Sequence, residues 1–111
     1  MKTFLICPVR GVDQSYAESI VESLEALGYR AHYPARDTNQ DDETGLRICK
    51  DNWRAIQEAD VVHCIWDGDS QGCLFDAGMA FAAGKKIIPV SLPPRTPHKS
   101  FQNMLEAYSC E

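Results

Sequence analysis

Apolar and polar positions change along the chain in blocks that predict strands and helices in turn. Residues 2–7 and 61–66 form nearly continuous apolar runs, typical of strands buried in a parallel sheet. Residues 30–33 and 87–90 predict two further strands. Strands that alternate with helices indicate a parallel sheet with right-handed crossovers. The pattern predicts an α/β protein, a small three-layer α/β/α sandwich with a Rossmann-like or flavodoxin-like sheet of four or five parallel strands.

Between the strands, apolar residues recur at helical spacing. We expect helices that begin near residue 15, after Thr44 and near Gly72, and a fourth over residues 100–108. Gly28 is suited to end the first helix, and the polar residues 34–43 predict a mobile surface loop. The expected apolar faces are Tyr16, Ile20, Leu24 and Leu27, then Leu46, Cys49, Trp53 and Ile56, and finally Phe101, Met104, Leu105 and Tyr108.

Length and charge narrow the class of protein. The 111 residues predict a single domain over 1–111. The net charge of -5 and the lack of a basic stripe argue against a nucleic-acid partner. No apolar run is long enough to span a bilayer, so we expect no membrane association. The N-terminal residues do not resemble a targeting segment, which favours a cytoplasmic location.

The cysteines and histidines do not form a metal-binding or disulfide pattern. The five cysteines include no C-x-x-C pair, and we expect reduced thiols with a structural role. Cys73 alone lies near a predicted helix N-terminus, where a thiol pKa is lowered. The histidines are scattered, and His63, inside a strand, is expected to be a core residue. We therefore predict no metal site, and because the chain also lacks the glycine motifs of dinucleotide and ATP sites, we expect no organic cofactor.

Acid and hydroxyl groups gather after the third predicted strand. Asp67, Asp69 and Ser70 belong to the loop, and Asp76 lies in the helix that follows. In α/β proteins such loops lie at the carboxyl edge of the sheet, where ligands bind. Asp67 and Asp69 either bind substrate hydroxyls or a base, or form a turn around the Asp-Gly pair. Trp66 either stacks on a base at the floor of the pocket or packs in the core.

Three segments together resemble the nucleoside 2-deoxyribosyltransferase superfamily, including its 2'-deoxynucleoside 5'-monophosphate N-glycosidase branch. They are Phe4-Leu-Ile-Cys-Pro-Val-Arg-Gly11, the helix and strand entry at 48–62 that ends in Ala-Asp-Val-Val, and the block at 70–85. Their order and spacing carry the resemblance over most of the chain. The resemblance implies cleavage or exchange at the N-glycosidic bond of a nucleoside or nucleotide.

The resemblance also implies roles for particular residues. Asp76 takes the position of the family's nucleophilic Glu, and Asp51 or Asn52 takes that of an acid that assists at the base or sugar. Arg10 and Ser70 resemble residues that hold the 5'-phosphate. The C-terminal segment of this family reaches the neighbouring subunit's site, which implies a homodimer. The full set expected to bind substrate is Phe4, Val9, Arg10, Gly11, Trp66, Asp67, Ser70, Gly72, Gln102 and Asn103.

Three positions depart from the family pattern. Asp76 is one methylene shorter than the family's Glu, Asn52 replaces an ionisable Asp, and Phe4 replaces a Tyr that contacts the nucleophile. A misplacement of about 1 Å can reduce a rate by on the order of 100-fold. Two hypotheses follow. The chain is either an enzyme that acts on the N-glycosidic bond through a carboxylate nucleophile, or a non-catalytic nucleotide-binding or sensing module that retains the pocket.

Overall fold

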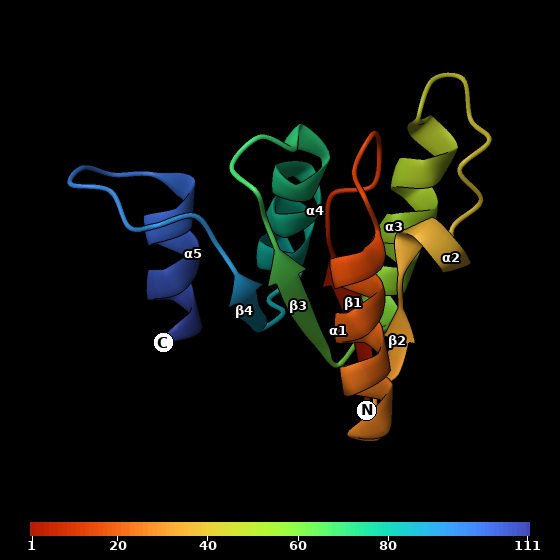
Figure 1. The fold of residues 1–111 in the computed structure, drawn as a ribbon, viewed down its shortest axis with the longest axis horizontal. Coiled ribbons are helices and arrows are strands. Elements are labelled where there is room, and N and C mark those ends of the chain that lie inside the picture. The colour runs from red at the N-terminus through yellow and green to blue at the C-terminus, as the bar shows by residue number, and fades with distance from the viewer.

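Four parallel strands form one sheet in the order β2-β1-β3-β4. The computed structural model describes residues 1–111 and is drawn in Figure 1. The sheet pairs Phe4 of β1 with His32 of β2 on one side and with Val62 of β3 on the other. The strands are β1 (Lys2–Ile6), β2 (Arg30–His32), β3 (Val61–Ile65) and β4 (Ile87–Ser91). The predicted α/β class and four-stranded parallel sheet are confirmed.

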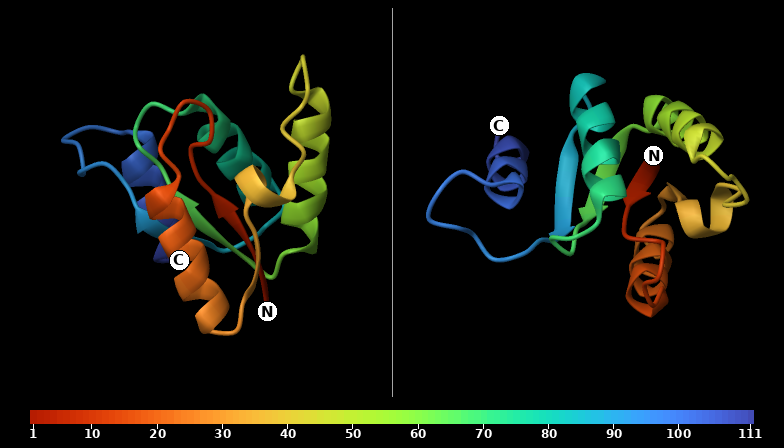
Figure 2. Two further views of the ribbon diagram at one scale, coloured as in Figure 1. Left: turned by 45° about the vertical axis from the view of Figure 1, so that its right-hand side comes forward. Right: turned by 90° about the horizontal axis from the view of Figure 1, so that it is seen from above.

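Helices cover both faces of this sheet. The helices are α1 (Ser15–Ala26), α2 (Pro34–Asp37), α3 (Leu46–Glu58), α4 (Gln71–Ala82) and α5 (Phe101–Ser109). Seen from above, α1 lies on one face, and α3, α4 and α5 lie along the other (Figure 2, right). No helix is both long enough and apolar enough to cross a membrane.

The strands explain this three-layer arrangement, because successive side chains point to opposite faces. Phe4 and Ile6 of β1 belong to the cluster that α3, α4 and α5 complete. Leu5 and the following Cys7 belong to the smaller cluster around α1. Both faces of β1 are therefore buried from Thr3 onward, which is why Phe4, Leu5 and Ile6 are all apolar.

The helices are rotated relative to the apolar faces expected from the sequence. In α1 the buried residues are Ala17, Val21 and Leu24, whereas Tyr16 and Leu27 are exposed. These buried positions have helical spacing, and the small Ala17 allows close packing on the sheet.

The two later helices show the same difference. In α3 the buried residues are Asn52 and Ile56, and Leu46 is exposed. In α5 only Leu105 is buried, since Phe101 and Met104 are each about half exposed. Four of the nine exposed large apolar residues, Phe75, Phe81, Phe101 and Met104, lie on α4 and α5.

Residues 34–37, the first part of the expected surface loop, form a helical turn, whereas residues 39–43 have no regular structure. Pro34 begins the short helix α2, and the proline ring suits the first position of a helix. The Asp37 carboxylate accepts a hydrogen bond from the Tyr33 N–H at 2.9 Å. Thr38, which follows, is buried. The Asp and Asn residues of this segment predict a loop, but Pro34 and Asp37 belong to one helical turn.

The strand order locates the ligand-binding edge. The chain leaves β1 for β2 on one side and later enters β3 on the other, so the switch point lies between β1 and β3. The loops after these two strands diverge there, and such a crevice is the usual ligand site of an open α/β sheet.

Candidate functional site

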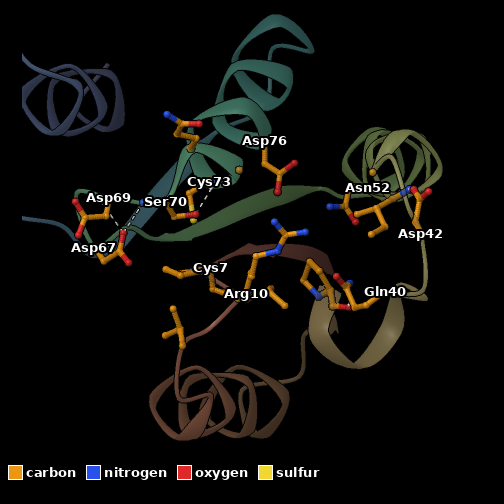
Figure 3. A pocket seen from close by; sticks show the side chains of 18 of the residues that line it. Cys7, Arg10, Gln40, Asp42, Asn52, Asp67, Asp69, Ser70, Cys73 and Asp76 are labelled. Atoms are coloured by element: carbon orange, nitrogen blue, oxygen red, sulfur yellow. Dashed lines mark hydrogen bonds between the residues drawn. The ribbon is translucent and has the colours of Figure 1, made fainter.

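A cavity of about 950 Å³ opens at this switch point. Its walls come from the loop after β1, the segment between α2 and α3, the face of α3 and the β3–α4 loop with the start of α4 (Figure 3). This volume lies within the range of small-molecule sites, about 300–1,000 Å³. The polar groups that line it are Arg10, Gln40, Asp42, Glu43, Thr44, Asn52, Asp67, Asp69, Ser70, Gln71 and Asp76.

Asp76 lies on α4 and faces the cavity beside Asn52 of α3 (Figure 3). Burial raises the pKa of the Asp76 carboxyl to about 7, while the neighbouring Asn52 side chain opposes this rise. A buried carboxyl is costly to ionise, and a donor to its charged form reduces that cost. Asp76 therefore changes charge near neutral pH.

Asp67 lies in the loop of the same wall and has the opposite electrostatic character. Its Oδ1 accepts the backbone N–H groups of Asp69 at 2.9 Å and Ser70 at 2.8 Å. These bonds lower the pKa of the Asp67 carboxyl. Gly68 between them has φ of +88°, a conformation that favours glycine. Asp67 thus closes the turn and stays ionised while its other oxygen faces the cavity side.

Ser70 begins helix α4. Its hydroxyl oxygen accepts the Cys73 N–H at 3.3 Å, which is a helix N-cap interaction. The cap uses the hydroxyl oxygen as an acceptor. Ser70 therefore caps helix α4 and also lies on the cavity wall.

Arg10 brings positive charge to a cavity otherwise lined by acids. Its side chain extends from the loop after β1 into the space below Asp76 (Figure 3). The ion pairs of the chain involve Arg36, Arg47 and Arg54, and none involves Arg10. Because no carboxylate of the chain neutralises Arg10, its guanidinium is available to a ligand anion.

Comparison with known proteins identifies the family. A family model described as nucleoside 2-deoxyribosyltransferase matches residues 4–105. The chain belongs to this family. Family membership supports transfer or cleavage at an N-glycosidic bond as the chemistry of the site. No curated protein matches the chain.

Two solved structures share the fold of this deoxyribosyltransferase family member. A 2-deoxyribosyltransferase from Bacillus psychrosaccharolyticus superimposes with a TM-score of 0.76 at 21% identity, over 97% of this chain and 82% of that one. The CMP N-glycosidase BcmB of Clostridium botulinum gives a TM-score of 0.67 at 21% identity, over 98% of this chain and 83% of that one. At this identity, the similarity shows a common fold.

The cavity brings together most of the catalytic and substrate-binding residues expected from the sequence. Catalytic candidates Asp76 and Asn52 both line it. Asp51, the alternative to Asn52, does not, because its carboxylate pairs with Arg47 at 3.0 Å and Arg54 at 3.7 Å. The expected binding residues on its wall are Val9, Arg10, Asp67, Ser70 and Gly72.

The remaining expected binding residues lie outside the cavity wall. Gly11 has φ of +68° and shapes the turn beside Arg10. Phe4 is fully buried and stacks on His32 with ring centroids 5.4 Å apart. Trp66 is buried, and its Nε1 donates to the Ser70 carbonyl at 3.0 Å, so it supports the loop from the core.

Gln102 and Asn103 at the start of α5 also lie away from this chain's cavity. The Gln102 amide donates to the Pro94 carbonyl at 3.2 Å. The Asn103 side chain accepts the Thr96 N–H at 3.0 Å and donates to the carbonyls of Thr96 and His98. Both side chains hold the segment before α5 in place.

The thiol with the best sequence signal is not activated. Burial raises the pKa of Cys73 to about 11, which exceeds the lowering by its hydrogen bond with Ser70. Burial likewise raises the pKa of Cys7 to about 12. All five cysteines are free. No group of three or more His, Cys, Asp or Glu side chains is arranged to hold a metal ion.

Sequence reasoning missed the wall contributed by residues 40–48. Asp42 lines the cavity, and its carboxylate accepts the Ile48 N–H at 3.1 Å. This and other backbone hydrogen bonds lower the pKa of Asp42. The run Asp41-Asp42-Glu43-Thr44 before a helix is a capping signal, but only the fold shows that it faces Asp67 and Asp76 across one cavity.

Proposed function

We propose that the protein cleaves or transfers the N-glycosidic bond of a nucleoside or nucleoside monophosphate, with Asp76 as the nucleophile. The observation that carries this proposal is the position of Asp76, a largely buried carboxyl on the wall of a ligand-sized cavity at the switch point. A carboxylate suits this reaction because it can trap an oxocarbenium-like sugar carbon. Family membership supplies the reaction class.

The proposed reaction has two steps. In the first, a carboxylate oxygen of Asp76 bonds to C1' of the sugar while the C1'–N bond breaks. The electron pair of that bond leaves with the base, which takes up a proton from solvent. In the second, water or an acceptor base attacks C1', the ester bond to Asp76 breaks, and the carboxylate is regenerated. Loss of a proton from the attacking group completes the balance.

Charge arrangement supports the orientation of the substrate. Arg10 is a free cation on the cavity wall and suits the 5'-phosphate or 5' end of the substrate. Ser70 can donate its hydroxyl proton to the same end. Asn52, beside Asp76, is placed to contact the sugar or base.

The rival function is nucleotide binding or sensing without turnover. A specific observation favours it: burial raises the pKa of Asp76 to about 7, and a protonated carboxyl is not a nucleophile. Asp76 in its charged form has to be the active species if the leading proposal holds. Activity should then increase as pH rises through about 7, whereas a general acid at this position would show the reverse.

Base release distinguishes the two functions. We would incubate the protein with a panel of ribo- and deoxyribonucleosides and their 5'-monophosphates at pH 8 and quantify free base by chromatography. Asp76→Ala is the negative control, and Asp76→Glu restores the reach of the family's nucleophile. Base release that Asp76→Ala abolishes and Asp76→Glu maintains supports the proposal. Tight binding without any base release would support the sensing module.

We also propose that the chain forms a homodimer through the apolar surface of α4 and α5. Phe75 and Phe81 of α4 and Phe101 and Met104 of α5 are each more than half exposed. A symmetric dimer would cover them and bring the start of α5 toward the neighbouring site. Sedimentation equilibrium at micromolar concentration tests this, with Phe101→Ser as the disrupting variant. The absence of a nucleic-acid partner and the cytoplasmic location stay predictions.

A further inference from the structure

A chain of hydrogen bonds reaches Asn52 from outside the cavity. His32 lies at the end of β2, Thr38 follows α2, and Asn52 lies in the middle of α3. The His32 Nε2 and Thr38 Oγ1 are 2.8 Å apart, and Thr38 Oγ1 donates to Asn52 Oδ1 at 2.9 Å. Thr38 and Asn52 are 4% and 6% exposed. Neither His32 nor Thr38 lines the cavity.

In this series of hydrogen bonds, each residue donates to the next, from His32 to Thr38 and from Thr38 to Asn52. The Asn52 Oδ1 only accepts, so the single hydroxyl proton of Thr38 points to it. The Thr38 oxygen then accepts from His32, which assigns the Nε2–H tautomer to that ring. Burial lowers the pKa of His32, which favours a neutral ring at neutral pH. The NH₂ group of Asn52 is left on the other side of the amide.

That remaining side of the amide faces Asp76. In Figure 3 the amide nitrogen of Asn52 lies toward Asp76 and its oxygen lies away. The neighbouring Asn52 side chain lowers the pKa of Asp76 and so favours the ionised carboxylate. If the amide were turned by 180°, its oxygen would face the carboxylate, and two acceptors would oppose each other across a buried contact. The direction of this amide therefore decides whether Asn52 helps or hinders ionisation.

We propose that Thr38, supported by His32, is a positioning residue that fixes the Asn52 amide with its NH₂ group toward Asp76. This inference rests on the proposed function, because it matters for turnover only if Asp76 acts as a carboxylate. Thr38 acts through Asn52 and does not touch the substrate. Asn52, where the family pattern has an acid, thereby becomes a fixed donor to Asp76.

The other ionisable groups near Asp76 and near His32 do not replace the Asn52 amide as a donor to Asp76. Asp76 is surrounded by the thiols of Cys7, Cys64 and Cys73, whose pKa values burial raises to about 12, 12 and 11, so they are uncharged. Arg10 and the ionised Asp42 and Asp67 line the same cavity. The charged groups that face His32 are Arg36 and Asp37 of α2 and Asp51 and Glu58 of α3.

A matched pair of variants tests the proposal. Thr38→Val keeps the shape of the side chain and removes the hydroxyl, whereas Thr38→Ser keeps the hydroxyl. A ¹³C NMR titration of the aspartate carboxyls in the ligand-free protein reads the pKa of Asp76 without any need for activity. In Thr38→Val the Asn52 amide is no longer held in one direction. Loss of its donor group beside the Asp76 carboxylate is expected to raise the Asp76 pKa by about one pH unit or more. Thr38→Ser should titrate like the parent protein.

The pH dependence of kcat/KM should shift in the same direction as the Asp76 pKa. If the protein turns over substrate, the acid limb of kcat/KM should shift upward by the same amount in Thr38→Val and stay in place in Thr38→Ser. A role limited to stability would lower the melting temperature without moving this limb. The tautomer of His32, read from its ring ¹⁵N shifts in the parent protein, gives a measurement that does not depend on folding of a variant.

The outcomes separate this proposal from the proposed function. An unchanged Asp76 pKa in folded Thr38→Val, or an Nδ1–H tautomer of His32 in the parent protein, overturns the positioning role. A raised Asp76 pKa in a protein that releases no base keeps the positioning role and refutes the proposed reaction. Base release that depends on Asp76 but not on Thr38 keeps the reaction and refutes the positioning role.

Discussion

Asp67 and Asp76 line one cavity, and their surroundings shift their pKa values in opposite directions. Asp67 lies in an exposed loop whose backbone N–H groups bind its carboxylate and lower its pKa. Asp76 lies on the buried side of α4, where loss of hydration raises its pKa to about 7. The same side chain is thus fixed as an anion in one place and can gain or lose a proton in the other.

This difference shows why residue type alone does not assign a role. Pairs of acids whose environments push their pKa values apart are a common feature of sites that use acid and base chemistry. Asp67 organises the loop and contributes constant negative charge. Asp76 is buried beside a hydrogen-bond donor group, which suits a nucleophile whose protonation depends on pH. The variants below exchange or remove these features, from the largest expected effect to the smallest.

The largest effect is expected from Asp76→Asn. Removal of the proposed nucleophile should reduce base release by on the order of 10³-fold or more. Asp67→Asn is the matched control at the same cavity, and its amide oxygen can still accept the N–H groups of Asp69 and Ser70. We expect it to retain far more turnover. Equal losses in the two variants, measured by initial rates at pH 8, would contradict the assignment of separate roles.

The same pair should differ in the pH dependence of stability. A carboxyl whose pKa is raised on folding stabilises the protein only while it is protonated, so the parent protein should lose stability as pH rises from about 4 to above 7. Asp76→Asn removes that penalty, which is on the order of 4 kcal/mol at full ionisation. We expect its unfolding free energy to exceed that of the parent protein at pH 8 and to approach it at pH 4.

Asp67 should show the opposite sign. Its pKa is lowered on folding, so its contribution is present above about pH 4 and is lost as pH falls. Asp67→Asn should therefore be less stable than the parent protein at pH 8. Urea unfolding at both pH values measures both variants. A stability gain in Asp67→Asn, or none in Asp76→Asn, would show that the two environments do not differ as described.

Arg10→Ala should weaken monophosphate binding more than nucleoside binding. A charged hydrogen bond is worth roughly 1.5–3 kcal/mol, or about 10- to 150-fold in affinity. Arg30→Ala removes an exposed arginine on β2, at the far end of the sheet from the cavity, and is the control. Calorimetric titrations with a nucleoside and its 5'-monophosphate compare the two. Equal losses for both ligands in Arg10→Ala would exclude phosphate recognition by this residue.

The predictable part of the molecule follows from patterns that repeat. The nearly continuous apolar runs at 2–7 and 61–66 predict β1 and β3 to within one residue, because a strand buried on both faces carries few polar residues. The parallel order of the strands then places Arg10, Ser70 and Asp76 at one edge. These residues line the cavity in the structure.

The unpredicted part depends on contacts between segments distant in sequence. Thr38 is an ordinary loop residue by composition, yet it joins His32 of β2 to Asn52 of α3. Asn52 has the polarity of a solvent-facing residue, yet it is buried, and its side-chain oxygen accepts the Thr38 hydroxyl inside the protein. Phe4 lies under His32 and away from the cavity. Such cross-strand and cross-helix pairings leave no periodic signal.

The smallest effect is expected from Cys73, and it tests whether burial outweighs the helix N-terminus at this position. With a pKa of about 11, the thiol is ionised in about one molecule in 10,000 at pH 7, so it should be inert in turnover. Cys73→Ala should lose about 1 kcal/mol of stability from reduced packing and keep most of its base release. Brief treatment of the native protein with iodoacetamide at pH 7, followed by peptide mass spectrometry, should modify the exposed Cys110 and spare Cys73. Rapid labelling of Cys73, with inactivation that substrate prevents, would show instead that the helix N-terminus activates the thiol and that Asp76 shares its site with a second nucleophile.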